Sequence, residues 1–258
     1  MNDILKKLVG FLVMVGLFVL LSFVNREQIN RIVEKPEIKI NKLKGDPFMD
    51  ESDVENLVYT RLDTLEGKLI GDLKLGEIEN LLEDQPSVKN AEVYTSIKGD
   101  VHLNIDLKRV IARFKPDTTK GFYLDDHGGI MRWVSKYTPR VLTVTGHLHK
   151  YNRFLKDSLV TSDLRTHSKL INDVYAFAKF VDQSSYWKAQ IGQVYINKSG
   201  DAVIIPLVGN QEFILGDLSD YELKLNKIKI FHKKIAMKVG WGKYKIVNLK
   251  FNNQIVCK

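Results

Sequence analysis

Cysteine is nearly absent from this 258-residue sequence, and proline and glycine are scarce. The single cysteine, Cys257, excludes an internal disulfide and a zinc site built from several cysteines. No base lies near it in the sequence, so a nucleophilic role is not expected. With only 6 prolines and 17 glycines, the chain is not expected to contain long disordered tracts.

Recognisable catalytic and cofactor motifs are missing as well. The sequence contains no H-E-x-x-H, G-x-S-x-G or phosphate-binding-loop pattern. The nearest approach to a metal cluster is "DDHGG", residues 125–129, where two carboxylates adjoin a histidine. Runs of Asp and Gly between two strands are typical of tight turns, which favours a turn over an ion site. We therefore predict a protein that is not an enzyme, with no catalytic residues, no cofactor and no metal ligands.

Basic residues exceed acidic ones and give a formal net charge of +8. This balance is compatible with nucleic acid or with an anionic surface. No run of five basic residues gathers the charge into one patch, so a solvated basic surface is favoured. Neither nucleic acid nor a small-molecule substrate is expected as a partner.

One long apolar run lies near the N-terminus. Residues 8–24 carry no charge, and basic residues flank both ends. As a helix the run would measure about 25 Å, the short end of what crosses a bilayer. A cleaved signal peptide is the alternative, although no small-residue cleavage site follows. The sequence thus predicts a single-pass membrane protein, with a cytoplasmic tail at 1–7, a transmembrane helix at 8–24 and a stalk at 25–36.

The residues that follow predict a small domain with the order β-α-α-β-β. Periodicity indicates a strand at 37–43, helices at 52–62 and 75–85, and a hairpin with strands at 88–96 and 101–107. Asp50 or Ser52 would cap the first helix. The last strand alternates, with four apolar residues on one face: Val101, Leu103, Ile105 and Leu107.

The rest of the chain predicts a mostly antiparallel β domain with two helices. The expected elements are strands at 121–124, 130–133 and 140–148, a helix at 167–181, a hairpin at 190–207, a strand at 211–217, a helix at 219–235 and a strand at 243–251. Together with the preceding segments this makes an α+β protein with one transmembrane helix.

Several of these stretches resemble the FtsQ/DivIB family of bacterial cell-division proteins. Residues 75–114 are similar to the family's POTRA domain through Pro86, Val88, Ala91, Val93, Gly99, Val101, Leu103, Ile105, Arg109, Val110, Ala112 and Arg113. "GFYLDDHGGIM", "RVLTVTG" and "YKIVNLKFNNQIVCK" resemble the family's β domain, and "GWGKY" resembles its Bacteroidetes-type branch. The chain departs from the family pattern at Lys108 and Ile111, and at Asn248, where Asp is commoner.

The resemblance implies a POTRA domain at 37–113, a β domain at 114–251 and a C-terminal tail at 252–258. It implies a non-enzymatic scaffold of the division septum that links early and late division proteins. Such a protein lies in the cell inner membrane, with its C-terminal domains in the periplasm. It also implies that the β domain binds FtsB and FtsL by adding a partner strand to a sheet edge. The alternative is an envelope-assembly or secretion POTRA protein; an envelope enzyme would need a catalytic pair that the sequence does not offer.

The final strand is the best candidate for that sheet edge. Along "KYKIVNLKF", one face carries Val247, Leu249 and Phe251 and is apolar enough to pack on a core. A strand so close to the end of the sequence would leave its outer edge open to a partner. We predict partner contacts at four residues: Lys250, Phe251, Gln254 and Ile255. The alternative is that this strand is internal and closes the sheet.

Overall fold

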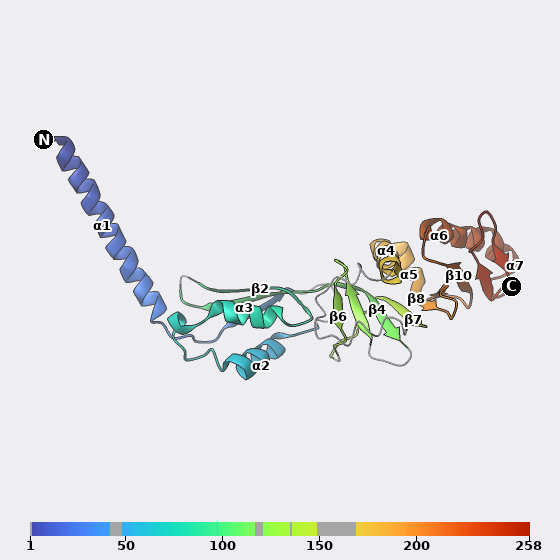
Figure 1. Ribbon diagram of the computed structural model, residues 1–258, viewed down its shortest axis with the longest axis horizontal. Helices are drawn as coiled ribbons and strands as arrows, with labels where there is room; N and C mark the ends of the chain where they lie inside the picture. Colours follow the sequence, from blue (N-terminus) through green and yellow to red (C-terminus); the bar gives the residue numbers. More distant parts are fainter. Residues whose placement is uncertain (1, 42–47, 97, 117–120, 135, 149–168) are drawn as a thin grey trace. The chain divides into compact units, whose positions relative to one another are not determined.

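The computed structural model describes residues 2–41, 48–96, 98–116, 121–134, 136–148 and 169–258. Within these residues the chain divides into two compact units, Met1–Leu107 and Lys108–Lys258. Figure 1 shows the elements of each unit.

The first unit contains the predicted β-α-α-β-β order. Its helices are α1 (Asn2–Ile29), α2 (Glu51–Leu62), the single 3₁₀ turn η1 (Ile70–Asp72) and α3 (Leu75–Glu83). Its strands are β1 (Glu37–Asn41), β2 (Val88–Thr95) and β3 (Val101–Leu107), arranged in the order β1-β3-β2. Strand β1 runs parallel to β3, and β2 runs antiparallel to it. The last two residues of the strand predicted at 37–43 lie outside the described residues.

Apolar and polar residues alternate along β3, and the apolar ones lie on one buried face, as predicted. All four apolar residues are buried, with Ile105 fully so. They form one core with Val54 and Val58 of α2 and with Ile78 and Leu82 of α3. Because successive side chains of a strand point to opposite faces, this pattern fixes which face of the sheet the two helices cover.

The prediction of a transmembrane helix at 8–24 is wrong. Helix α1 does form there, but none of the helices in the described part of the chain combines the length and the apolar character needed to cross a bilayer. The physical reason is length. An uncharged run of about 25 Å falls short of a hydrocarbon core about 30 Å thick, which takes about 20 consecutive apolar residues.

The segment predicted as a stalk is partly built into the first unit. Helix α1 extends to Ile29, and Val33 is only 2% exposed. The amide of Val33 donates to the carbonyl of Lys68 (2.9 Å), and its carbonyl accepts from Gly67 (3.0 Å). These two bonds bring residues 31–33 beside the loop that follows α2.

The second unit is a nine-stranded mixed sheet with helices on one face (Figure 1). Its strands are β4 (Val110–Pro116), β5 (Phe122–Asp125), β6 (Ile130–Arg132), β7 (Leu142–Gly146), β8 (Ile191–Ile196), β9 (Ala202–Pro206), β10 (Glu212–Gly216), β11 (Ile246–Asn248) and β12 (Val256–Cys257). Its helices are α4 (Lys169–Gln183), α5 (Ser185–Gln190) and α6 (Tyr221–Ile230), which continues through the π-helical turn η4 (Phe231–Ala236) into α7 (Met237–Val239). The spatial order is β12-β11-β10-β9-β8-β7-β4-β5-β6.

Antiparallel pairing predominates, but β4 with β7, β7 with β8, and β10 with β11 are parallel. Two of these parallel pairs follow from helical connections. Helices α4 and α5 join β7 to β8, and helix α6 lies between β10 and β11, so the chain returns to the end of the sheet at which the first strand began. Residues 167 and 168 of the predicted helix lie outside the described residues. The sequence did not predict α5, the edge strand β12, the turn η1 or the buried strand β4. Residues 110–113 of β4 belong, by the resemblance, to the predicted POTRA domain.

Candidate functional site

The predicted final strand is shorter than expected and is not at the sheet edge. Strand β11 covers only Ile246–Asn248 and lies between β10, which is parallel to it, and β12, which is antiparallel. The chain reverses at Asn252–Asn253, and Val247 and Asn248 then face Cys257 and Val256. Among the described strands, β12 therefore forms this edge of the sheet, and β6 forms the other.

The reversal between β11 and β12 is held in place by polar contacts. Asn253 has φ 59°, a left-handed conformation that asparagine tolerates better than most residues. The side chain of Asn248 accepts a hydrogen bond from the amide of Lys250 (3.0 Å). From helix α6, the ammonium of Lys227 donates to the carbonyl of Leu249 (3.2 Å). These contacts fix where the chain turns back.

Strand β12 shows backbone polar groups on its outer side. The amide of Lys258 donates to the carbonyl of Ile246 (2.9 Å), and its carbonyl accepts from the amide of Ile246 (3.1 Å). Backbone groups alternate in direction along an antiparallel strand, so those of Cys257 point away from β11. The side chain of Cys257 packs against the core, and burial raises the pKa of its thiol. At the outer side of β12, Cys257 therefore presents its backbone and not its thiol.

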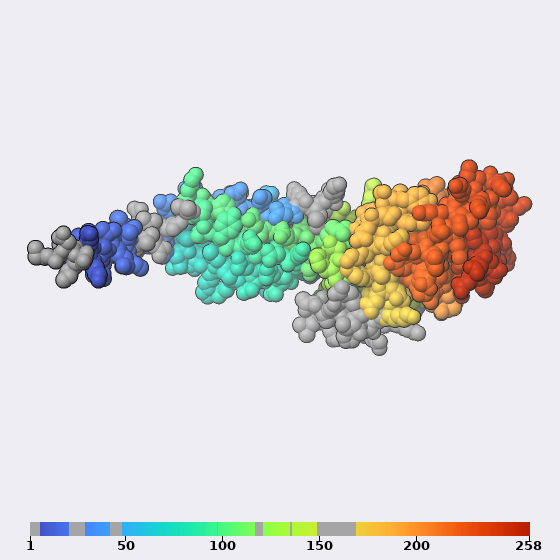
Figure 2. All heavy atoms as spheres, turned by 90° about the horizontal axis from the view of Figure 1, so that it is seen from above, coloured from blue at the N-terminus to red at the C-terminus, as the bar shows by residue number. Residues whose placement is uncertain are grey.

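The four predicted contact residues lie together on this turn. Phe251 is 46% exposed and Gln254 is exposed, whereas Ile255 is half-buried against the core. Lys250 is exposed, and its ammonium pairs with Asp201 at 2.9 Å. The space-filling view shows the C-terminal residues, drawn in red, at the surface of the second unit (Figure 2). Whether these four residues contact a partner remains a prediction.

Sequence reasoning missed Val256, which is 44% exposed at the edge itself. The signal was present, because the apolar run Ile255–Cys257 follows the asparagine pair. Two residues are too few to show strand periodicity, and only pairing with β11 identifies them as a strand.

The Asp125–Gly129 stretch forms the predicted turn between β5 and β6. The carboxylate of Asp125 accepts from the amides of His127 (2.9 Å) and Gly129 (2.7 Å). Asp126 accepts from Arg109 at 3.0 Å. Burial by itself would raise the pKa of Asp126, but hydrogen bonds from Arg109 and His127 lower it overall. The three side chains at 125–127 are close enough to share an ion, yet these contacts already explain both carboxylates as parts of a turn.

His232 sits among aromatic rings close to the segment that leads to β11. Its ring centroid lies 4.9 Å from that of Trp241 and 5.6 Å from that of Phe213. Burial lowers the pKa of His232, because an apolar site disfavours the charged imidazolium. The amide side chain of Gln211, itself buried, donates to the carbonyl of Trp241. Through these contacts, Gln211 holds Trp241 beside the start of β10, and His232 holds it beside η4.

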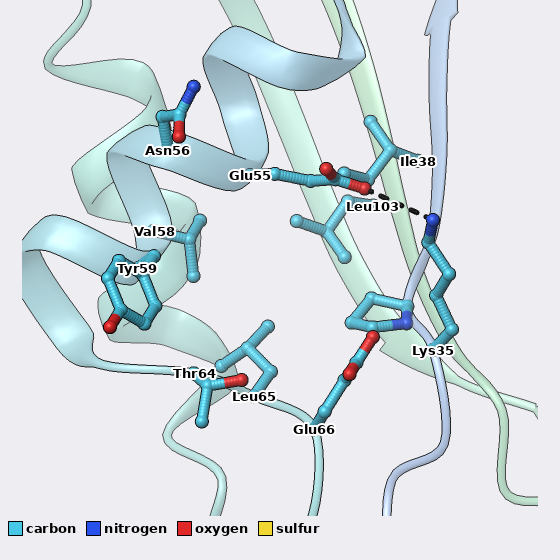
Figure 3. A pocket seen from close by; sticks show the side chains of 11 residues that line it. Lys35, Ile38, Glu55, Asn56, Val58, Tyr59, Thr64, Leu65, Glu66 and Leu103 are labelled. Carbon is cyan, nitrogen blue, oxygen red and sulfur yellow. Dashed lines mark ion pairs between the residues drawn. The ribbon is translucent and has the colours of Figure 1, made fainter.

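The first unit has a groove of ≈ 300 Å³ beside β1 (Figure 3). Apolar side chains from α2 and the sheet line it, among them Ile38, Val58 and Leu103. Lys35 and Glu55 form an ion pair at its rim with 3.6 Å between the charged atoms. Both side chains are largely exposed, so the pair adds little stability. Polar side chains line the groove as well, among them Glu66, Tyr59 and Thr64.

The architecture and the comparisons identify the class. The chain contains a POTRA-like domain: the model of that description matches residues 31–106, the segment that forms the β-α-α-β-β unit. More particularly, the chain belongs to the FtsQ/DivIB family, because the family model described as FtsQ/DivIB, C-terminal related, matches residues 109–258, more than half of the sequence. This confirms the resemblance noted in the sequence, and the family is one of non-enzymatic division scaffolds. A search of curated proteins returned no match.

Proposed function

We propose that this chain is a scaffold of the division septum, and that it binds a strand of an FtsB- or FtsL-type partner along the outer side of β12. The family membership supports the division role. The observation that carries the binding mode is the position of β12 as the last strand of the described sheet, with the backbone groups of Cys257 turned outward. A partner strand satisfies such groups by β-augmentation.

The side chains around β12 suit a partner that is partly apolar and partly acidic. Val256 and Phe251 offer exposed apolar surface at the edge and at the turn. Four lysines, all exposed, lie on or beside β11 and β12: Lys243, Lys245, Lys250 and Lys258. Positive charge at an interface rim speeds the encounter with an acidic segment and orients it.

Replacing Cys257 by proline tests this binding mode directly. Proline removes the one outward amide, whereas the inward bonds of Lys258 to Ile246 involve other residues and remain. We expect Cys257→Pro to lose binding to the purified soluble domain of an FtsB-type partner from the same cell. Cys257→Val keeps the amide and serves as the matched control, with binding close to that of the parent chain. Equal binding by both variants, each shown to be folded, would contradict strand addition at β12.

A second experiment tests the cellular role. We propose that the protein works at the septum, so a fluorescent fusion should form a band at midcell during constriction. Uniform envelope fluorescence would contradict the division role and favour a general envelope-assembly function. The fusion should be made at the N-terminus, because a C-terminal fusion would lie beside β12.

A further inference from the structure

The three-stranded sheet of the first unit has β2 at one edge, and this edge is occupied by side chains of the chain itself. The amide of Val93 donates to the carboxylate of Glu79 at 2.8 Å. The amide of Ala91 donates to the carboxylate of Glu83 at 3.3 Å. Both glutamates belong to helix α3, and both amides point away from β3, the neighbouring strand. Two edge amides that a second strand would need are therefore already bonded.

The spacing of the two glutamates matches that of the two amides. Residues four apart on a helix are separated by about 6 Å along its axis. Residues two apart on a strand are separated by about 6.6 Å. Glu79 bonds the later amide and Glu83 the earlier one, so the helix and the strand run in opposite directions.

Packing holds α3 at the distance these bonds require. Ile78 and Leu82, the residues just before each glutamate, are buried in the same core as Ala91 and Val93. A further hydrogen bond to β2 lies just after the end of α3, where the amide of Val88 donates to the carbonyl of Gln85 at 3.0 Å. Three amides of β2, those of Val88, Ala91 and Val93, are thus bonded to α3 or to the residues that follow it.

We propose that Glu79 and Glu83 close the β2 edge to strand addition, and in particular to pairing with β2 of a second copy of this chain. An unprotected edge strand is a template for such pairing, and inserted charged groups are a common protection. Here the carboxylates act as hydrogen-bond acceptors as well as charges. The proposal does not depend on what β12 binds.

The test compares the full chain with Glu79→Ala/Glu83→Ala. Amide hydrogen exchange reports on Ala91 and Val93, and sedimentation velocity reports on association. Loss of bonds to charged acceptors should raise exchange at these two amides by about tenfold or more. The double variant should also form dimers as its concentration rises, while the parent chain stays monomeric. Glu83→Ala alone, read at Ala91, is the second variant should the double change disturb the fold, because Glu83 is exposed.

Two matched controls separate hydrogen bonding from charge. Glu77→Ala/Asp84→Ala removes two negative charges from the same helix without touching β2, since Glu77 pairs with Lys74 instead. Glu79→Gln/Glu83→Gln removes the charges but keeps an oxygen acceptor on each side chain. Both controls should stay monomeric. Unchanged exchange in the double alanine variant overturns the proposal, and so does fast exchange without association.

Discussion

The ammonium of Lys227 lies 2.5 Å from the backbone carbonyl oxygen of Phe251 and donates a hydrogen bond to it. Lys227 belongs to helix α6, whose face packs on the sheet, whereas Phe251 begins the turn into β12. A charged donor on a fixed helix thus determines where an exposed turn ends and where the edge strand begins. The position of the edge strand β12 therefore depends on a contact between two residues that are 24 apart in the sequence.

The first prediction concerns this contact. Lys227→Met keeps the aliphatic stem and removes the ammonium, so the carbonyls of Leu249 and Phe251 lose their donor. We expect a loss of about 1 kcal/mol in local stability, because the bonds are charge-assisted but partly exposed. Faster hydrogen exchange at 256–258 would show it. Lys233→Met, on the exposed side of η4, is the control, and equal exchange in both variants would contradict the role given to Lys227.

The second prediction concerns acid stability. Burial alone would raise the pKa of Asp182, but hydrogen bonds from Lys188 (2.7 Å) and Arg109 (2.6 Å) hold it below its ordinary value. Because the folded pKa is the lower one, the unfolded state takes up the proton first as pH falls. The stabilisation is complete above about pH 5, declines around pH 4 and disappears below the folded pKa.

Asp182→Asn removes that titration. At neutral pH it should cost about 1–2 kcal/mol after allowance for solvent screening, since Arg109 is 42% exposed. The variant should also lose less stability than the parent chain between pH 5 and pH 3. Urea unfolding at several pH values measures both effects. Parallel stability–pH curves for the two proteins would show that Asp182 does not titrate as described.

The third prediction concerns Gly146 at the end of β7. Its φ is +94°, and a Cβ there would lie 2.2 Å from the carbonyl oxygen of Ile196. That carbonyl is fixed by a hydrogen bond from the amide of His147 (2.8 Å), so it cannot move away freely. Gly146→Ala should cost about 3 kcal/mol or more from strain and overlap together.

A comparison with Gly200 distinguishes backbone strain from steric overlap. Its φ is +87°, but no heavy atom lies within 4 Å of the position a Cβ would take. Gly200→Ala should therefore cost only the strain, about 1 kcal/mol. Thermal unfolding of the two variants measures the difference. Equal losses would mean that overlap with Ile196 contributes nothing.

The fourth prediction concerns the start of α2. The carboxylate of Asp50 accepts from the amide of Asp53 (3.1 Å), and the carboxylate of Asp53 accepts from the amide of Asp50 (2.9 Å). Asp50→Ala should lower helix stability by about 1 kcal/mol. Ser52→Ala should cost less, because the Ser52 hydroxyl donates to the Asp50 carboxylate and not to the helix backbone. Exchange of the amides at 51–54 would report both, and a larger effect at Ser52 would contradict this assignment of the cap.

Much of the fold could be predicted because its signals are local. The alternation of Val101, Leu103 and Ile105 established a half-buried strand, and all three are buried. The turn residues at 125–129 and 198–201 correctly marked two hairpins. The membrane span predicted at residues 8–24 is wrong, because none of the described helices is both long enough and apolar enough to cross a bilayer. Val33 was assigned to a stalk because nothing local shows that Gly67 and Lys68 bond to it.

The sequence by itself indicated the family and the β-α-α-β-β order, since both depend on motifs and periodicity within short stretches of the chain. Only the tertiary structure decided which strand forms the edge. That outcome depends on register between β11 and β12 and on Lys227, which lies far from both in sequence. The same holds for the closed edge of β2, because Glu79 and Glu83 become acceptors for its amides only when helix and strand pack together. Hydrogen bonds between distant segments carry no local periodicity, and for that reason neither the edge strand β12 nor the bonded amides of β2 could be recognised from the sequence.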